Sequence, residues 1–129
     1  MIDRSLAIVA ALNMFAAVGA GAFGAHGLKR ILSAEMLSVW QTAVTYQMMH
    51  ALGMLTLAVV TRRMDSTWLT VAGWTMLVGI VLFCGSLYAL ATTGLRWLGP
   101  ITPIGGAAFL LAWVMVAWGC WRAAPLNAG

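Results

Sequence analysis

The chain has 129 residues, of which 63% are hydrophobic and only 8% are charged, and its formal net charge is +4. Soluble domains carry roughly 25% charged residues, so this composition excludes a water-soluble globular protein. The seven Lys and Arg residues are scattered singly or in pairs. That scatter is typical of membrane topology signals and of contact with anionic lipids, and it argues against nucleic acid as a partner.

Four apolar stretches predict the fold class: an all-α integral membrane bundle of four transmembrane helices with up-down topology. An α-helix needs about 20 residues to cross ~30 Å of hydrocarbon, and each stretch is near or above that length. The stretches are residues 6–28, 43–61, 68–92 and 104–121. With their connections they use nearly all of residues 1–129, so we expect a single domain and no separate catalytic domain.

The first stretch carries small residues at four-residue spacing in two adjacent stripes. Because lipid supplies little hydrophobic force between helices, close backbone approach over small residues is a main source of packing energy. The stripes predict contact with other helices of the chain, a homo-oligomer seam, or both. The expected packing positions, including three glycines of the later stretches, are Ala16, Ala17, Ala20, Gly21, Gly24, Ala25, Gly85, Gly105 and Gly106.

The first stretch also has two features of a cleaved signal peptide. It follows Arg4 and contains the small-residue run Gly19-Ala-Gly-Ala22. Its apolar part is longer than the 7 to 15 residues typical of a signal core, and three more stretches follow. We therefore expect it to be retained as a membrane span.

The segment before the second stretch is itself predicted to be helical. Ser33 can cap a helix with Glu35 in its first turn, where the positive end of the helix dipole favours a carboxylate. The second helix is therefore expected to begin near residue 34, at the membrane interface, and to run to about 61. In the last connection, Thr102 is a plausible cap with Pro103 at the first helical position.

Tryptophans and cysteines mark the limits and the interior of the spans. An indole near the end of a span places its apolar rings in lipid and its N–H group in contact with water. We expect this of Trp40, Trp68, Trp97 and Trp121, whereas Trp74 and Trp113 sit deeper and are expected to be packing residues. The cysteines, Cys84 and Cys120, lie within apolar stretches and are expected to behave as small buried apolar residues rather than as a disulfide.

The flanking charges favour an orientation with both termini in the cytoplasm. Only Lys and Arg count in the positive-inside rule. Four lie on the side of the termini and three on the opposite side: Arg4, Arg62, Arg63 and Arg122 against Lys29, Arg30 and Arg96.

Polar residues within the spans are the candidates for a site, because each unsatisfied polar group in hydrocarbon costs several kcal/mol. At a rise of ~1.5 Å per residue, His50 lies ~18 Å from the edge that Arg62 marks, and the other candidates lie further out. They gather in the half of the membrane away from the termini. The candidate polar site consists of His26, Thr42, Tyr46, Gln47, His50, Ser86, Tyr88 and Thr102; Asn13 is a further polar residue within a span.

This asymmetry argues against a continuous polar pore through one subunit, and it leaves two interpretations open. One is a polar pocket open toward the far side; the other is a hydrogen-bonded plug that fixes helix packing. No metal is expected within a subunit, since His26 and His50 differ in depth by ~15 Å while ligands of one ion lie ~4 Å apart. No catalytic residue is expected, because no span holds a carboxylate, a G-x-S-x-G elbow or an HExxH motif.

Several motifs together resemble the domain-of-unknown-function 423 family. They are Gly21-Ala-Phe-Gly-Ala-His26-Gly-Leu28, Trp40-Gln-Thr42 with Tyr46-Gln47 and His50, Phe83-Cys-Gly85-Ser86-Leu87-Tyr88, and Thr102-Pro103-Ile-Gly105-Gly106. The resemblance covers nearly the whole chain in order. It implies a small four-span protein of the bacterial cytoplasmic (inner) membrane, with related transmembrane proteins in animals. It implies no activity.

The expected role is a non-enzymatic small membrane module, such as a subunit or assembly factor. Such a module would contact membrane lipids and pack against itself or against a larger membrane complex. It would have no resident cofactor, although the interpretation as a pocket in the outer half of the membrane allows it to hold a lipid, a quinone or a small polar solute. The alternative is an oligomeric transporter or channel with its pathway along subunit seams.

Overall fold

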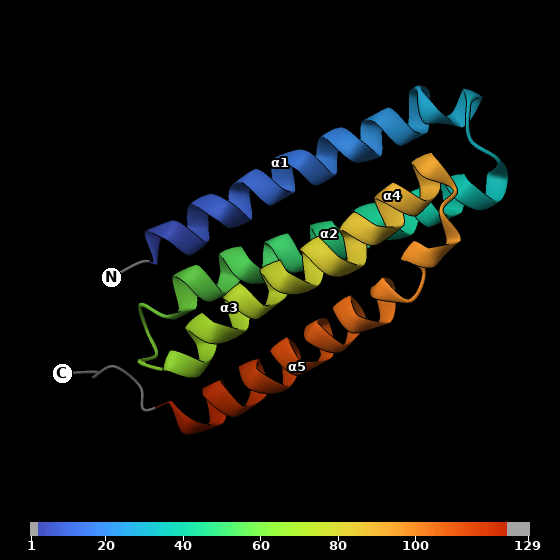
Figure 1. Cartoon of the computed structure of the whole chain (residues 1–129). Coiled ribbons are helices and arrows are strands. Elements are labelled where there is room, and N and C mark those ends of the chain that lie inside the picture. The colour runs from blue at the N-terminus through green and yellow to red at the C-terminus, as the bar shows by residue number, and fades with distance from the viewer. Residues whose placement is uncertain (1–2, 124–129) are drawn as a thin grey trace.

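The computed structural model describes residues 3–123, and this part of the chain is helical almost throughout (Figure 1). Its elements are α1 (Arg4–His26), η1 (Leu28–Arg30), α2 (Ala34–Val60), α3 (Thr67–Gly79), η2 (Ile80–Cys84), α4 (Gly85–Thr93), η3 (Arg96–Leu98) and α5 (Ile101–Arg122). The helices form four segments of 27 residues, with mean hydropathy between 1.4 and 2.0, that are long and apolar enough to cross a membrane. The predicted fold class, with four long apolar helices, is confirmed.

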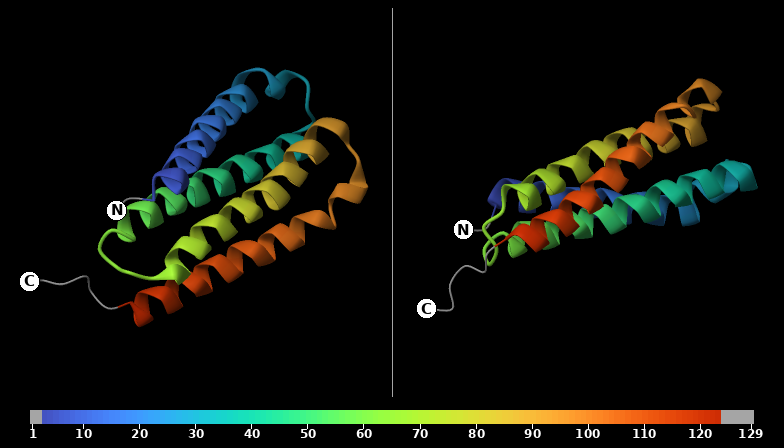
Figure 2. Two further views of the ribbon diagram at one scale, coloured as in Figure 1. Left: turned by 60° about the vertical axis from the view of Figure 1, so that its left-hand side comes forward. Right: turned by 90° about the horizontal axis from the view of Figure 1, so that it is seen from below.

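The four spans are arranged as two helical hairpins that pack through α2. One hairpin is α1 with α2, and the other is α3, η2 and α4 with α5 (Figure 2). Helix α2 also contacts α3, η2 and α4, and eight of its 27 residues are buried, compared with four of the 23 residues of α1. Helix α2 is therefore the central element, while α1 presents most of its surface to the outside. The described chain ends, residues 3 and 123, lie at the same end of the molecule.

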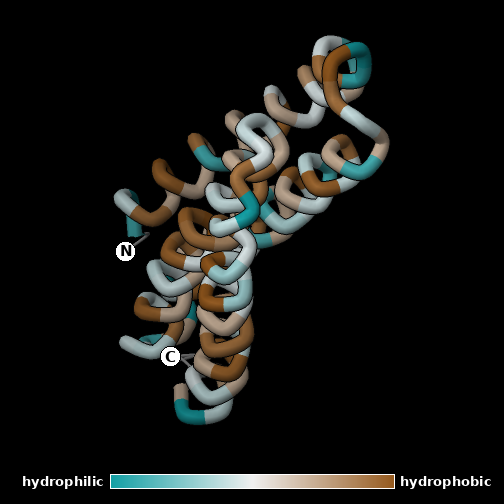
Figure 3. Tube along the Cα trace, turned by 45° about the vertical axis from the view of Figure 1, so that its right-hand side comes forward, coloured by the Kyte–Doolittle hydropathy of each residue, from teal (hydrophilic) through white to brown (hydrophobic). Residues whose placement is uncertain are grey.

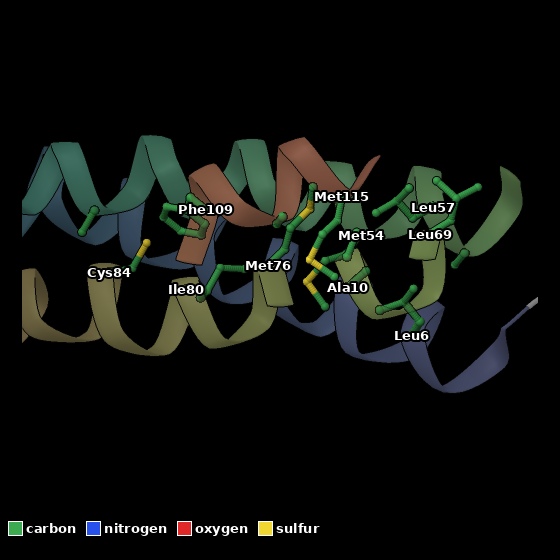
Figure 4. Close-up of a cluster of buried hydrophobic side chains, with 14 of the residues drawn as sticks. Leu6, Ala10, Met54, Leu57, Leu69, Met76, Ile80, Cys84, Phe109 and Met115 are labelled. Carbon is green, nitrogen blue, oxygen red and sulfur yellow. The ribbon is translucent and has the colours of Figure 1, made fainter. Parts of the chain in front are cut away.

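The apolar core runs along the molecule from Leu6, at the end where the termini lie, to Cys84 in the other half (Figure 4). Leu6 of α1, Met54 of α2, and Leu69 and Met76 of α3 are completely buried there. A Cβ at Gly73 would lie 2.6 Å from a Leu6 methyl, so the missing side chain allows α1 to approach α3 at this end. The buried polar side chains among residues 3–123, Gln47, His50 and Ser86, are not part of this cluster.

Only part of the small-residue pattern on α1 faces α2. Ala17 and Gly24 are buried, and the indole Nε1 of Trp40 donates a 2.8 Å hydrogen bond to the Ala20 carbonyl. A Cβ at Gly24 would lie 2.7 Å from the Trp40 ring, so this residue must be small for the indole to reach the helix. Ala16 and Ala25, by contrast, are exposed. Each predicted stripe thus contributes to contact within the chain, through Ala17 and Gly21 of one and Gly24 of the other.

The start of α2 follows the sequence prediction, and the start of α5 does not. The Ser33 side chain accepts a 3.2 Å hydrogen bond from the Met36 N–H, as its capping role requires. Helix α5 begins at Ile101 after Pro100, and no side chain caps it. The prediction that Thr102 is the cap was wrong, because its hydroxyl lies 2.6 Å from the hydroxyl of Ser86 instead.

Three further sequence predictions need correction. Cys84 is buried as expected, but Cys120 is exposed on the outer surface of α5. The N–H of Trp40 is not in water, because it bonds to α1. Trp113 is 46% exposed and does not fill the core. Along the chain, hydrophilic residues concentrate at the helix ends and in the loops, and the residues of the helices between them are mainly apolar (Figure 3).

Candidate functional site

The predicted polar residues do not form one cluster. The structure divides them into a hydrogen-bonded chain across three helices, a histidine enclosed by aromatic rings, and a hydroxyl pair beside the π-helix η2. His26 and Thr42 belong to none of these groups. Both are exposed, and the Thr42 hydroxyl donates to the Ser38 carbonyl of its own helix.

The first group links α1, α2 and α4. The Tyr88 hydroxyl donates to the side-chain Oε1 of Gln47 over 2.7 Å, and the side-chain Nε2 of Gln47 donates to the side-chain Oδ1 of Asn13 over 3.2 Å. Asn13 in turn donates to the Val9 carbonyl over 3.0 Å. Every member has a partner, so this chain matches the hydrogen-bonded plug that was one of the two interpretations.

The second group is built around His50. Its Nδ1 lies 2.7 Å from the Tyr46 carbonyl, and its Nε2 lies 3.1 Å from the indole Nε1 of Trp113. Because the carbonyl can only accept and the indole can only donate, Nδ1 carries the hydrogen and Nε2 accepts. Both nitrogens are thus occupied in the neutral ring. The imidazole is 3% exposed and stacks on Phe109, with centroids 3.6 Å apart.

The third group is the pair of hydroxyls of Ser86 and Thr102, which lies beside the π-helix η2. A π-turn shifts the backbone hydrogen-bond register and leaves a carbonyl in need of a donor. The Ser86 hydroxyl donates to the Phe83 carbonyl over 2.9 Å, so Thr102 supplies the hydrogen for the bond between the two hydroxyls. On the same face, a Cβ at Gly105 would lie 2.7 Å from the Phe83 Cα. Helix α5 therefore rests directly on the π-helix backbone.

A cleft of about 510 Å³ opens beside His50, between α2, η2 and α5. Its walls are mainly aromatic and apolar, and none of the described residues that line it is charged. Since Leu110 is 72% exposed and Trp113 is 46% exposed, the cleft opens on the outer surface of the helices, toward lipid. The lining residues are Tyr46, Met49, His50, Phe83, Pro103, Gly106, Ala107, Phe109, Leu110 and Trp113.

Sequence reasoning missed most of this cleft. Phe83 and Phe109 carry no polar or ionisable group that marks a membrane residue as functional, and the one polar group of Trp113 is its indole N–H. These three residues lie near His50 only in the folded structure, where α5 packs against the π-helix at Gly105. The tryptophan deep in the fourth stretch was the only signal available. Among residues 3–123, no three His, Cys, Asp or Glu side chains are grouped as metal ligands.

The four apolar spans, the polar chain within them and the lipid-facing cleft define a small helical membrane protein. Comparison with known families agrees: the family model described as "Protein of unknown function (DUF423)" matches residues 20–106. The chain belongs to this family, also called the UPF0382 membrane proteins. The resemblance proposed from the sequence motifs is thereby confirmed.

Curated relatives match over most of their length. A UPF0382 membrane protein of Staphylococcus saprophyticus is 50% identical over 117 residues, which cover 89% of this chain and 95% of that protein. The UPF0382 membrane protein YwdK of Bacillus subtilis is 48% identical over 110 residues, covering 84% of this chain and 89% of YwdK. No solved structure matches the chain significantly. The protein is thus a multi-pass membrane protein of a bacterial family.

Proposed function

We propose that the protein is a non-enzymatic membrane module that binds a membrane-dissolved amphiphile in the cleft between α2, η2 and α5. The observation that carries this proposal is the cleft itself, whose volume of about 510 Å³ lies within the range of ligand sites. Because it opens on exposed side chains of α5, a molecule dissolved in the bilayer can enter it sideways. The cleft lies toward the loops at residues 27–33 and 94–100, which we take to be the outer side.

A binding role is better supported than catalysis. His50 has both ring nitrogens occupied by hydrogen bonds within the protein. General acid or base chemistry would need one nitrogen within reach of a reacting group. The other lining residues are apolar apart from Tyr46 and the Trp113 indole. The site is therefore suited to holding a ligand rather than to transforming it.

A conduit through one subunit is less well supported. A water or solute pathway needs a lining of polar groups, or a hydrophobic constriction that can fill with water, across the whole membrane. Beyond the cleft, toward the termini, Met54, Met76 and Met115 belong to a closed apolar core. A pathway along the seams of a homo-oligomer, or a role within a larger complex, stays a prediction from the sequence, where the small-residue stripes of the first stretch suggested it.

Filling the cleft tests the proposal. Ala107 lines the cleft and is exposed, so Ala107→Phe should occupy ligand space without a clash in the core. Ala117→Phe is the matched control, because it adds the same ring to an exposed position of α5 outside the cleft. Native mass spectrometry after mild extraction should show a bound small molecule on wild type and on Ala117→Phe, and about tenfold less of it on Ala107→Phe. Equal retention by all three, or none on wild type, would overturn the proposal.

A further inference from the structure

The hydrogen-bonding capacity of the cleft is concentrated in one group, the Tyr46 hydroxyl. Tyr46 is 38% exposed and lines the cleft, and its hydroxyl has no hydrogen-bond partner among residues 3–123. The Trp113 N–H is already donated to His50. A hydroxyl without a partner in hydrocarbon costs free energy, so a ligand with an acceptor gains affinity there.

Three of the aromatic rings that line the cleft are nearly parallel, whereas Phe83 is tilted by 41° from Tyr46 and Trp113 by 59° from His50. The Tyr46 ring is within 9° of the plane of His50 and within 19° of the plane of Phe109. His50 and Phe109 are within 11° of each other. Planar rings prefer offset stacked or edge-on contact with such faces, whereas a saturated acyl chain gains nothing from their alignment.

The charge of the cleft restricts the ligand further. None of its lining residues is charged, and His50 is held as the neutral ring by its two partners. A phosphate or ammonium head group would therefore be desolvated without a counter-charge, which is costly. A head group whose polar atoms are neutral carbonyls suits this environment.

From these observations we infer that the cleft binds the head group of a membrane quinone, with Tyr46 donating a hydrogen bond to a ring carbonyl. This inference rests on the proposed function and names the ligand class of the same site. It concerns binding alone and involves no electron transfer. Tyr46 is then the residue that distinguishes a ring with an acceptor from a plain hydrocarbon.

The test compares two probes on four proteins. The probes are radiolabelled 2-methyl-1,4-naphthoquinone and 2-methylnaphthalene, which has the same ring system without carbonyls. Binding is measured on protein in nanodiscs of palmitoyl-oleoyl phosphatidylglycerol, with empty nanodiscs as background. The proteins are wild type, Tyr46→Phe, Tyr88→Phe and Ala107→Phe. Tyr88→Phe is the matched control, because it removes a hydroxyl of the polar chain that lies outside the cleft.

Wild type and Tyr88→Phe should bind the quinone about fivefold to tenfold more tightly than the hydrocarbon, the effect of one hydrogen bond. Tyr46→Phe should bind both probes alike. Equal binding of the two probes by wild type, or unchanged quinone binding by Tyr46→Phe, would overturn the quinone inference. Ala107→Phe should lose both probes; if it binds them as wild type does, the site is not this cleft and the proposed function fails as well.

Discussion

Gly105→Ala is expected to destabilise the protein by about 3 kcal/mol, the upper end of the range for overpacking a core. The added Cβ would lie 2.7 Å from the Phe83 Cα and would also meet the Phe83 backbone nitrogen. A backbone cannot rotate away as a side chain can, so α5 must move off the π-helix. Unfolding by sodium dodecyl sulfate in mixed micelles measures the change.

Gly85→Ala is the control for this prediction. Gly85 lies two residues from Phe83 in sequence, is exposed, and has no heavy atom within 4 Å of the position of an added Cβ. Because Ala is the better helix former, this variant should be as stable as wild type or slightly more stable. Similar destabilisation by both variants would show that the contact between α5 and the π-helix is not what makes Gly105 necessary.

His50→Ala is expected to cost about 3 kcal/mol of stability, because it combines a cavity with an unpaired donor. The lost ring lies 3.6 Å from the Phe109 centroid, and the Trp113 N–H loses its acceptor. His50→Leu refills the space and should cost less, with the unpaired indole N–H as the remaining penalty.

A double variant separates these two contributions. In His50→Leu with Trp113→Phe, no indole N–H is left without an acceptor, so the pair should be more stable than the sum of the two single effects predicts. The same unfolding measurement supplies all the values of the cycle. Additive effects would mean that the hydrogen bond between Trp113 and His50 contributes nothing to stability.

The helices could be predicted from the sequence because the bilayer imposes length and polarity. The apolar stretches correspond to helices whose ends agree within a few residues, and the Ser33 cap was read directly from its residue type. The π-helix at Ile80–Cys84, which interrupts the third span, left no such signal. Its backbone at Phe83 lies against Gly105 of α5, a tertiary contact that the sequence does not show.

The candidate site was predictable only in part. Gln47, His50, Ser86 and Tyr88 were named because polar groups in hydrocarbon need partners, and the structure gives each of them one. Which residues pair depends on how the hairpins cross, and spacing along one helix does not determine this. Tyr46 and His50 were therefore grouped with Thr42, whereas in the structure they face the aromatic side chains of η2 and α5.

Photo-crosslinking at two neighbouring positions of α5 tests most directly whether the cleft holds a specific membrane-dissolved ligand. Leu110 lines the cleft, whereas Leu111 lines a separate groove with Trp68 and Trp118. Benzoylphenylalanine is placed at either position in cells, and the captured molecules are identified by mass spectrometry after irradiation. Position 110 should capture one molecular species in preference, while position 111 captures the bulk lipids. The same mixture of bulk lipids at both positions would contradict a ligand-binding cleft.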